Sequence, residues 1–164
     1  MYRIGIAGAS GYGGGELIRL VDGHPHMDAV YLAAGSKAGQ PLGAVHPHLR
    51  GGDRPLVALD PEAMSDLDLV FLALPHGASA LPAMDLVANG VKVVDLGSDF
   101  RLHSSERYDD AYGGGHPHED QLGEWAYGLP ELFRDSIIGT DRVAVPGCFP
   151  TAVALAIRNN KQIL

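Results

Sequence analysis

The single cysteine of this chain, Cys148, is its clearest candidate for covalent chemistry. It lies in the segment Val145-Pro-Gly-Cys-Phe-Pro-Thr151, after a short apolar run typical of a strand and before a segment typical of a helix. A thiol at a helix N-terminus ionises more readily than a free thiol, and the thiolate is a nucleophile. The alternative is a buried thiol that only packs, as free cysteines commonly do. The sequence leaves both roles open for Cys148.

A glycine-rich turn follows the first apolar run of the chain. Its glycines recur three residues apart, at Gly8, Gly11 and Gly14. Backbone without side chains lets a pyrophosphate approach the amide groups at a helix N-terminus, where the helix dipole favours anions. The spacing differs from G-x-G-x-x-G, and a tight turn without a ligand is the alternative. We predict a dinucleotide site whose residues are Gly8, Ser10, Gly11, Tyr12, Gly13 and Gly14.

The segment after the second apolar run bears on which dinucleotide binds. Folds that prefer NAD usually carry Asp or Glu there, to hold the ribose 2′-hydroxyl. This chain has no acidic residue from Ala33 to Gly39, and instead offers the hydroxyl of Ser36 and the ammonium of Lys37. The two groups suit a 2′-phosphate, which favours NADP (NADPH) as the cofactor. The alternative for Lys37 is an ordinary solvated lysine.

Pro75 and His76 follow the most apolar run of the chain, which Pro75 ends. Ligands of parallel α/β sheets bind outside the carboxyl ends of the strands. We therefore predict that Pro75 and His76 contact the cofactor or the substrate, and a purely structural loop is the alternative.

Ser98 and Arg101 follow another predicted strand, in Asp95-Leu-Gly-Ser-Asp-Phe-Arg-Leu102. A guanidinium can hold a carboxylate or a phosphate through two hydrogen bonds. Ser98 and Arg101 are therefore candidates for substrate binding. The alternative for Arg101 is an ion pair with Asp95 or Asp99.

Six of the eight histidines form three His-Pro-His units, at 24–26, 46–48 and 116–118. Two imidazoles that are two residues apart face the same side of a regular strand, so a metal site is conceivable. However, no cysteine or acidic residue stands nearby at the spacing of a metal ligand. We expect ordinary loops at the three units and no metal.

The elements that must position these groups alternate between strands and helices. Short apolar runs predict strands at 3–7, 29–34, 67–74, 91–96 and 142–145, and helical spacing predicts helices at 16–21, 78–88 and 150–157. We expect a loop over most of 101–124 and a short helix after Tyr127. This order predicts an α/β fold: a Rossmann-like dinucleotide-binding domain with a mainly parallel sheet flanked by helices.

Composition excludes several other classes of protein. Twelve Lys and Arg against 20 Asp and Glu give a net charge of −8, which argues against binding to nucleic acid. A single cysteine cannot form an intrachain disulfide and suits a reducing compartment. No apolar run approaches the ~20 residues that span a bilayer. The N-terminus lacks the pattern of a signal peptide, so we expect a cytoplasmic protein without a membrane partner.

Five motifs together resemble the N-acetyl-gamma-glutamyl-phosphate reductases of arginine biosynthesis. They are, in order, Gly8-Ala-Ser-Gly-Tyr-Gly-Gly-Gly-Glu-Leu17, Leu74-Pro-His-Gly77, Asp95-Leu-Gly-Ser-Asp-Phe-Arg-Leu102, Tyr127-Gly-Leu-Pro-Glu-Leu132 and Pro146-Gly-Cys-Phe-Pro-Thr-Ala152. Aspartate-semialdehyde dehydrogenases share the fold and the chemistry but differ around the cysteine. A paralogue that reduces a carrier-bound aminoadipyl phosphate in lysine biosynthesis shares most of the motifs.

The resemblance implies reduction of an acyl phosphate by NADPH to N-acetylglutamate semialdehyde and phosphate. Cys148 matches the family's nucleophile, which attacks the acyl phosphate and forms a thioester. The glycine turn would hold the pyrophosphate, and Ser36 and Lys37 the 2′-phosphate. A small acyl-phosphate substrate and a homo-oligomer of the full-length enzyme are also implied.

Members of that family are much longer than this chain, and their second domain carries a histidine acid/base and the dimer interface. We therefore expect an NADP-binding domain over 1–157 that ends in the cysteine helix, an atypical polar tail over 158–164, and no second domain in this chain. The predicted activity is that of the intact enzyme. A non-catalytic NADP-binding fragment, and a metal-binding domain built on the His-Pro-His units, are the alternatives.

Overall fold

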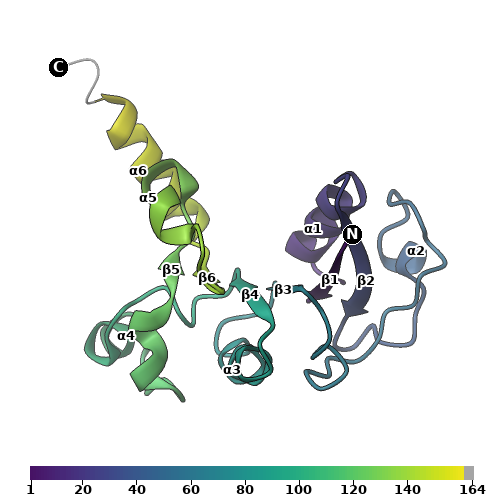
Figure 1. Ribbon diagram of the computed structural model, residues 1–164, viewed down its shortest axis with the longest axis horizontal. Coiled ribbons are helices and arrows are strands. Elements are labelled where there is room, and N and C mark those ends of the chain that lie inside the picture. Colours follow the sequence, from purple (N-terminus) through teal and green to yellow (C-terminus); the bar gives the residue numbers. More distant parts are fainter. Residues whose placement is uncertain (161–164) are drawn as a thin grey trace.

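A computed structural model describes residues 1–160 of the chain. Its strands form one sheet in the order β2-β1-β3-β4-β6-β5, and each neighbouring pair runs parallel (Figure 1). The strands are β1 (Tyr2–Ala7), β2 (Met27–Ala33), β3 (Leu69–Leu72), β4 (Lys92–Asp95), β5 (Ala126–Tyr127) and β6 (Arg142–Ala144). The predicted Rossmann-like parallel sheet is confirmed.

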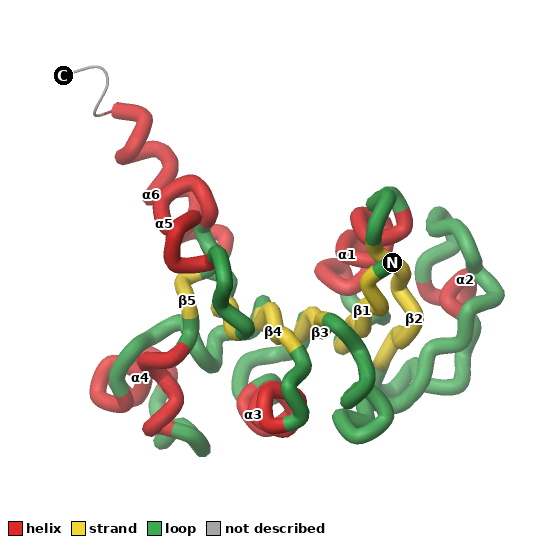
Figure 2. Tube along the Cα trace, viewed as in Figure 1, coloured by secondary structure: helices red, strands yellow, loops and turns green. Residues whose placement is uncertain are grey.

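Helices lie on both sides of this sheet, with α1, α5 and α6 on one side and α3 and α4 on the other (Figures 1 and 2). The helices are α1 (Tyr12–Asp22), α2 (Leu42–Val45), α3 (Ala80–Ala88), α4 (Ser105–Tyr112), the 3₁₀ helix η1 (Glu119–Glu124), α5 (Pro130–Ile137) and α6 (Cys148–Asn160). Two faces of a parallel sheet need such cover because both are apolar.

Two apolar clusters fill the space between the sheet and its helices. Ile4 and Ile6 of β1 pack with Ile18 of α1 in one cluster. Val70 and Leu72 of β3 belong to the other, which includes the buried face of α3 and continues to Trp125. Successive residues of a strand point to opposite faces, so short strands of apolar residues suffice to build both clusters. The clusters therefore pack both faces of the sheet against its helices.

The segment 101–124 differs from the prediction, since it contains α4 and η1 rather than mostly loop. Helix α4 is polar, with Tyr108 as its one buried residue, so no apolar stripe marks it in the sequence. Its signal is a cap: the hydroxyl of Ser104 accepts a hydrogen bond from the amide of Arg107. Strand β5 was also not predicted, because two residues are too short to form an apolar pattern.

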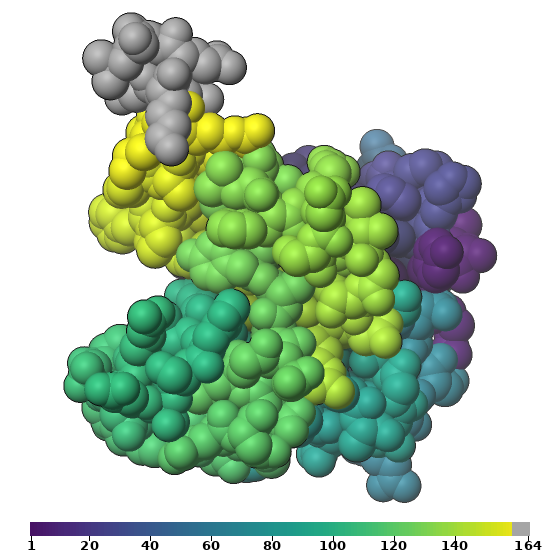
Figure 3. Space-filling model, turned by 60° about the vertical axis from the view of Figure 1, so that its left-hand side comes forward, coloured from purple at the N-terminus to yellow at the C-terminus, as the bar shows by residue number. Residues whose placement is uncertain are grey.

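Helix α6 begins at Cys148 and continues to Asn160, so it is longer than the predicted helix at both ends. Residues 158–160 of the expected polar tail belong to this helix, and residues 161–164 lie outside the described residues. The Arg158 side chain donates to the carbonyl oxygen of Glu131, which ties α6 to α5. In Figure 3, α6 projects from the body of the molecule in yellow. None of the helices within 1–160 has the length and apolarity to span a membrane.

Candidate functional site

The glycine turn joins β1 to α1 and presents amide groups at the start of the helix. Gly11 is the N-cap residue of α1, and no side chain caps it. The first intrahelical bond runs from the amide of Gly15 to the carbonyl of Gly11, at 2.9 Å. The amides of Tyr12, Gly13 and Gly14 precede that bond and lack intrahelical acceptors, so they are available to an anion.

Two of the glycines cannot carry a side chain. Gly8 has a φ of 84°, and a Cβ there would lie 2.1 Å from the carbonyl oxygen of Ala73, after β3. A Cβ on Gly14 would lie 2.2 Å from the carbonyl oxygen of Gly8. Gly13 differs, because its Cβ would meet only the Ala73 side chain, at 3.8 Å. Packing thus explains Gly8 and Gly14, while Gly13 leaves open space where a ligand would approach.

The residues predicted to select the cofactor lie beside this turn. The amides of Gly8 and Ala9 both donate to the carbonyl of Ala33, the last residue of β2. Ser36 and Lys37 follow in the next turn and are exposed. Lys37 forms no ion pair with any residue of 1–160. Its ammonium is therefore free to bind a phosphate near the end of β2.

The loop after β3 places Pro75 and His76 at the same edge of the sheet. Both residues are exposed. The Nδ1 atom of His76 lies 2.5 Å from Oγ of Ser98 and 3.5 Å from a carboxylate oxygen of Asp99. The His76 ring also packs on the ring of Tyr112, with 4.7 Å between centroids. Ser98 is itself buried, and its hydroxyl contacts His76.

Two buried aspartates link this loop to the end of β4. Oγ of Ser79 lies 3.1 Å from Asp95 and 2.9 Å from Asp99, and both carboxylates are fully buried. Burial raises the pKa of Asp95 to about 6, although the Gly97 amide and the Ser79 hydroxyl oppose the rise. Burial would also raise the pKa of Asp99, but hydrogen bonds from Gly77, Ser79 and Ala80 outweigh it and hold that pKa below its usual value.

Arg101 connects the end of β4 to the cysteine loop. Its Nε donates to the carbonyl of Val145 and its Nη2 to the carbonyl of Leu96, both at 2.7 Å. The ion pair with Asp95 or Asp99, considered above as an alternative, is wrong, because backbone carbonyls take these donors instead. The Nη1 atom would lie 3.3 Å from a Cβ on Gly147. A positive charge is therefore fixed beside the residue that precedes Cys148.

Cys148 is the first residue of α6 and follows β6 through a short turn. The cysteine is exposed, so the alternative of a buried packing residue is wrong. The hydroxyl and the amide of Thr151 both donate to the carbonyl of Gly147, which fixes the first turn of α6. A cavity of about 380 Å³ lies at this turn, lined by Arg101, Leu102, Tyr112, Tyr127, Gly147, Cys148, Phe149 and Pro150. A nucleophile, Cys148, and a cation, Arg101, thus line the same cavity.

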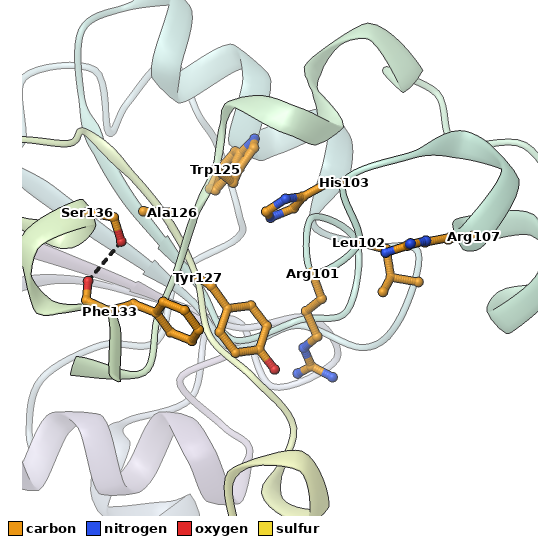
Figure 4. A pocket seen from close by; sticks show the side chains of 9 residues that line it. All are labelled: Arg101, Leu102, His103, Arg107, Trp125, Ala126, Tyr127, Phe133 and Ser136. Carbon is orange, nitrogen blue, oxygen red and sulfur yellow. Dashed lines mark hydrogen bonds between the residues drawn. The ribbon is translucent and has the colours of Figure 1, made fainter. Parts of the chain in front are cut away.

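A second cavity, of about 430 Å³, shares Arg101, Leu102 and Tyr127 with the cysteine cavity. Figure 4 shows the side chains of Trp125, Tyr127 and Phe133 along one part of its wall, with Arg101 and His103 across from them. It contains no thiol. Its place next to the cysteine cavity makes it an extension of that cavity rather than a separate centre.

The His-Pro-His units have structural contacts. Nε2 of His46 donates to the carbonyl of Ala9 at 3.0 Å, and Nδ1 of His116 accepts from the amide of His118. His116 is buried among aromatic rings, and burial lowers its pKa. Within residues 1–160, no three His, Cys, Asp or Glu side chains gather as a metal site.

The predicted residues gather at one edge, beyond the carboxyl ends of β2, β1, β3, β4 and β6. The chain order reverses between β1 and β3, where the loops carrying Gly8 and Ala73 meet. Such a switch point is where open α/β sheets bind ligands. Neighbouring strands lie roughly 4.8 Å apart, so three strand intervals, roughly 14 Å, separate the glycine turn from Cys148. An extended dinucleotide is long enough to bridge that interval.

Asp99 and Ser79 are the site residues that sequence reasoning missed. The sequence suggests Asp99 only as an ion partner of Arg101, and it gives no signal for Ser79. One signal was present: Asp95 ends a buried strand and Asp99 follows it four residues later. Their contact with Ser79 joins residues 16 and 20 positions apart, and no local pattern encodes such a contact.

Comparison with known proteins places the chain in a family. Residues 3–140 match the model of the semialdehyde dehydrogenase NAD-binding domain. The chain is 51% identical over 157 residues to the N-acetyl-gamma-glutamyl-phosphate reductase of Salinispora tropica, covering 94% of this chain and 45% of that protein. It is 42% identical over 154 residues to the [LysW]-L-2-aminoadipate 6-phosphate reductase of Deinococcus radiodurans, with 94% and 44% covered. The chain thus spans about half the length of these relatives.

The fold also matches solved structures. Aspartate semialdehyde dehydrogenase II of Vibrio cholerae, solved with ASA, superposes with a TM-score of 0.67 over 96% of this chain and 45% of that one. The sequence identity is 18%, so this likeness concerns the fold alone.

Proposed function

Because the chain belongs to the semialdehyde dehydrogenase family through its NAD-binding domain, we propose that it is the nucleotide-binding, nucleophile-bearing part of an NADPH-dependent N-acetyl-gamma-glutamyl-phosphate reductase. The observation that carries the proposal is the exposed Cys148 at the start of α6, on the same sheet edge as the glycine turn. A small acyl phosphate is the substrate. The full-length protein acts as a cytoplasmic homo-oligomer.

The first chemical step belongs to Cys148. Its thiolate attacks the acyl carbon, the bond from that carbon to the phosphate oxygen breaks, and inorganic phosphate leaves with the electron pair. A thioester on Cys148 remains. The guanidinium of Arg101, held beside Gly147 by two backbone carbonyls, attracts the phosphate and stabilises the charge that develops on it.

When bound, NADPH supplies the hydride that reduces the thioester carbon. The residues present fit this cofactor, because Gly8 and Gly14 bring backbone close together and the first-turn amides of α1 are free. Ser36 and Lys37 hold the 2′-phosphate, and Pro75 and His76 contact the cofactor after β3. Cys148 then leaves as thiolate from the tetrahedral carbon, which becomes the aldehyde. Carbon–sulfur bond cleavage restores the starting enzyme.

The proposal is tested on this chain in two measurements. Calorimetric titration at fixed salt compares NADPH with NADH, and we expect NADPH to bind at least ~10-fold more tightly, as a charge-assisted contact to the 2′-phosphate predicts. Intact-mass spectrometry then follows addition of N-acetyl-gamma-glutamyl phosphate, and we expect one acyl group per chain with release of phosphate. Cys148→Ser removes the only thiol and serves as the control.

The two measurements separate the alternatives. Tight NADPH binding without acylation supports a non-catalytic nucleotide-binding module. Acylation that persists in Cys148→Ser contradicts the assigned nucleophile. Absence of binding by either nucleotide contradicts the cofactor site.

A second candidate substrate is a carrier-bound aminoadipyl phosphate, which the similarity to the Deinococcus radiodurans protein favours. The higher identity to the Salinispora tropica reductase favours the acetylated glutamyl substrate. Acylation rates of Cys148 with the two acyl phosphates decide between them, and the faster donor marks the substrate.

A further inference from the structure

Asp99 takes no part in the reaction steps above, yet its carboxylate joins the loop that follows β4 to the loop that follows β3. We propose that Asp99 is a positioning residue: it holds the 75–80 loop, and His76 with it, in the conformation that NADPH binding requires. This inference rests on the proposed function, because it assumes that this loop contacts the cofactor.

The hydrogen bonds of Asp99 cap helix α3 from a distant part of the chain. Its Oδ1 accepts from the amide of Gly77 at 2.8 Å, and its Oδ2 accepts from the amides of Ser79 and Ala80 at 3.0 Å. The N-cap residue of α3 provides no side-chain cap of its own. A negative charge at a helix N-terminus satisfies free amides and complements the helix dipole. The loop before α3 is thus anchored by a residue that follows β4.

The same carboxylate controls the turn that carries His76. Gly77 adopts a φ of 76°, and this left-handed conformation turns its amide toward Asp99. Pro75, the residue before His76, is exposed. Nδ1 of His76 contacts Ser98, the neighbour of Asp99, at 2.5 Å. The Nδ1 side of the ring is therefore fixed inward, and Nε2 lies on the opposite side of the ring.

The backbone donors around Asp95 and Asp99 determine which carboxylate accepts the proton of the Ser79 hydroxyl. Its hydroxyl has one proton but lies between two carboxylate oxygens, so it can donate to only one of them. Asp99 has three backbone donors in addition, whereas Asp95 has the Gly97 amide alone. The Ser79 hydroxyl therefore donates to Asp99, and Asp95 can donate to that hydroxyl only while Asp95 is protonated.

The anchored loop lies where displacement matters most. Ala73, two residues before Pro75, forms the wall against which Gly8 packs. A shift of the 75–80 loop would therefore also displace Ala73 and, through it, the glycine turn at Gly8, where the proposed cofactor site lies. A structural contact far from the cofactor would have no such effect on binding.

The test compares Asp99→Asn with Asp85→Asn, which removes an exposed carboxylate from α3 itself. The amide of Asn presents hydrogens to amides that need an acceptor, so we expect Asp99→Asn to weaken NADPH binding at least ~10-fold. We expect the amides of Gly77, Ser79 and Ala80 to exchange hydrogen at least ~10-fold faster. Alkylation of Cys148 should stay at the wild-type rate, which separates loop displacement from general unfolding.

Each outcome decides the inference. Wild-type NADPH affinity in Asp99→Asn, or unchanged exchange at the three amides, overturns it while leaving the proposed function intact. Failure of wild type and Asp85→Asn to bind NADPH overturns the proposed function. If Asp99→Asn does not fold, Ser79→Ala is tested instead. This variant removes the hydroxyl donor to Asp99 and keeps the three backbone amides that donate to it. We then expect ~3-fold weaker binding, and wild-type affinity overturns the inference.

Discussion

The Nε atom of Arg101 lies 2.7 Å from the carbonyl oxygen of Val145, so one guanidinium fixes the turn that leads to Cys148. We expect Arg101→Lys to lose this contact or the one to Leu96, because an ammonium lacks the planar fork. The free energy of unfolding should fall by about 1–3 kcal/mol, and acylation of Cys148 should slow at least ~10-fold. Urea unfolding and timed mass spectrometry measure the two effects.

The matched control for Arg101→Lys is Arg107→Lys. Arg107 lines the neighbouring cavity and is exposed. Equal losses in both variants would mean that general charge, rather than the position of the Arg101 guanidinium, matters at the cysteine.

Gly13 and Gly14 should respond differently to alanine. Gly14→Ala places a methyl 2.2 Å from the carbonyl oxygen of Gly8, so we expect a loss of stability of at least ~2 kcal/mol. In Gly13→Ala the new methyl lies 3.8 Å from the Ala73 side chain, which is an ordinary contact. Because alanine favours a helix more than glycine does, the free energy of unfolding should stay the same or rise. If the turn seats a pyrophosphate, Gly13→Ala still weakens NADPH binding. Thermal unfolding with calorimetry reports both, and unaltered binding by Gly13→Ala would favour a turn without a ligand.

Asp95 makes stability depend on pH in a defined window. Its pKa is near 3.8 in the unfolded chain and about 6 when folded, so the folded state binds the extra proton between these values. The unfolding free energy should therefore fall as pH rises from about 4 to about 6, by at most about 1.4 kcal/mol per pH unit from this group. Chemical denaturation across this range measures the slope. Asp95→Asn should flatten it, and the same slope in that variant would assign it to another group.

Lys37 should contribute to the choice between NADPH and NADH. Lys37→Ala removes an ammonium without an ion partner in the described chain, so NADPH should bind ~10-fold more weakly while NADH binding changes little. The difference should shrink at high salt, because the lysine is exposed. Lys92→Ala, at the start of β4 and beside Asp141, is the control. An equal loss for both nucleotides would exclude a contact specific to the 2′-phosphate.

The sequence predicted those parts of the fold that have a local pattern. Apolar runs marked β1 and β3, and glycines marked the turn to α1, because strand burial and close backbone approach restrict residue type directly. Helix α4 was missed because its only buried side chain, Tyr108, gives no periodicity. The position of Cys148 at a helix start was visible, whereas its exposure was not.

The sequence predicted which residues belong to the candidate site, but not how these residues contact one another. Strand ends bring Gly8, His76 and Cys148 to one edge, and this follows from parallel topology alone. The partners of Arg101 did not follow, because both are backbone carbonyls and carry no residue signature. The contacts of Ser79 did not follow from the sequence either. They depend on two carboxylates that the packing of α3 against β4 brings to it.

Helix α6 carries a line of apolar side chains four residues apart, Phe149, Val153 and Ile157, whose exposed fractions are 82%, 55% and 58%. Removing such a line of side chains from water is favourable, so it attracts copies of the chain to one another. The net charge of −8 repels those copies. The balance between the two sets the colloidal behaviour of concentrated solutions. Added salt shortens the reach of the repulsion and leaves the apolar attraction, so light scattering should record a second virial coefficient that turns negative as ionic strength rises.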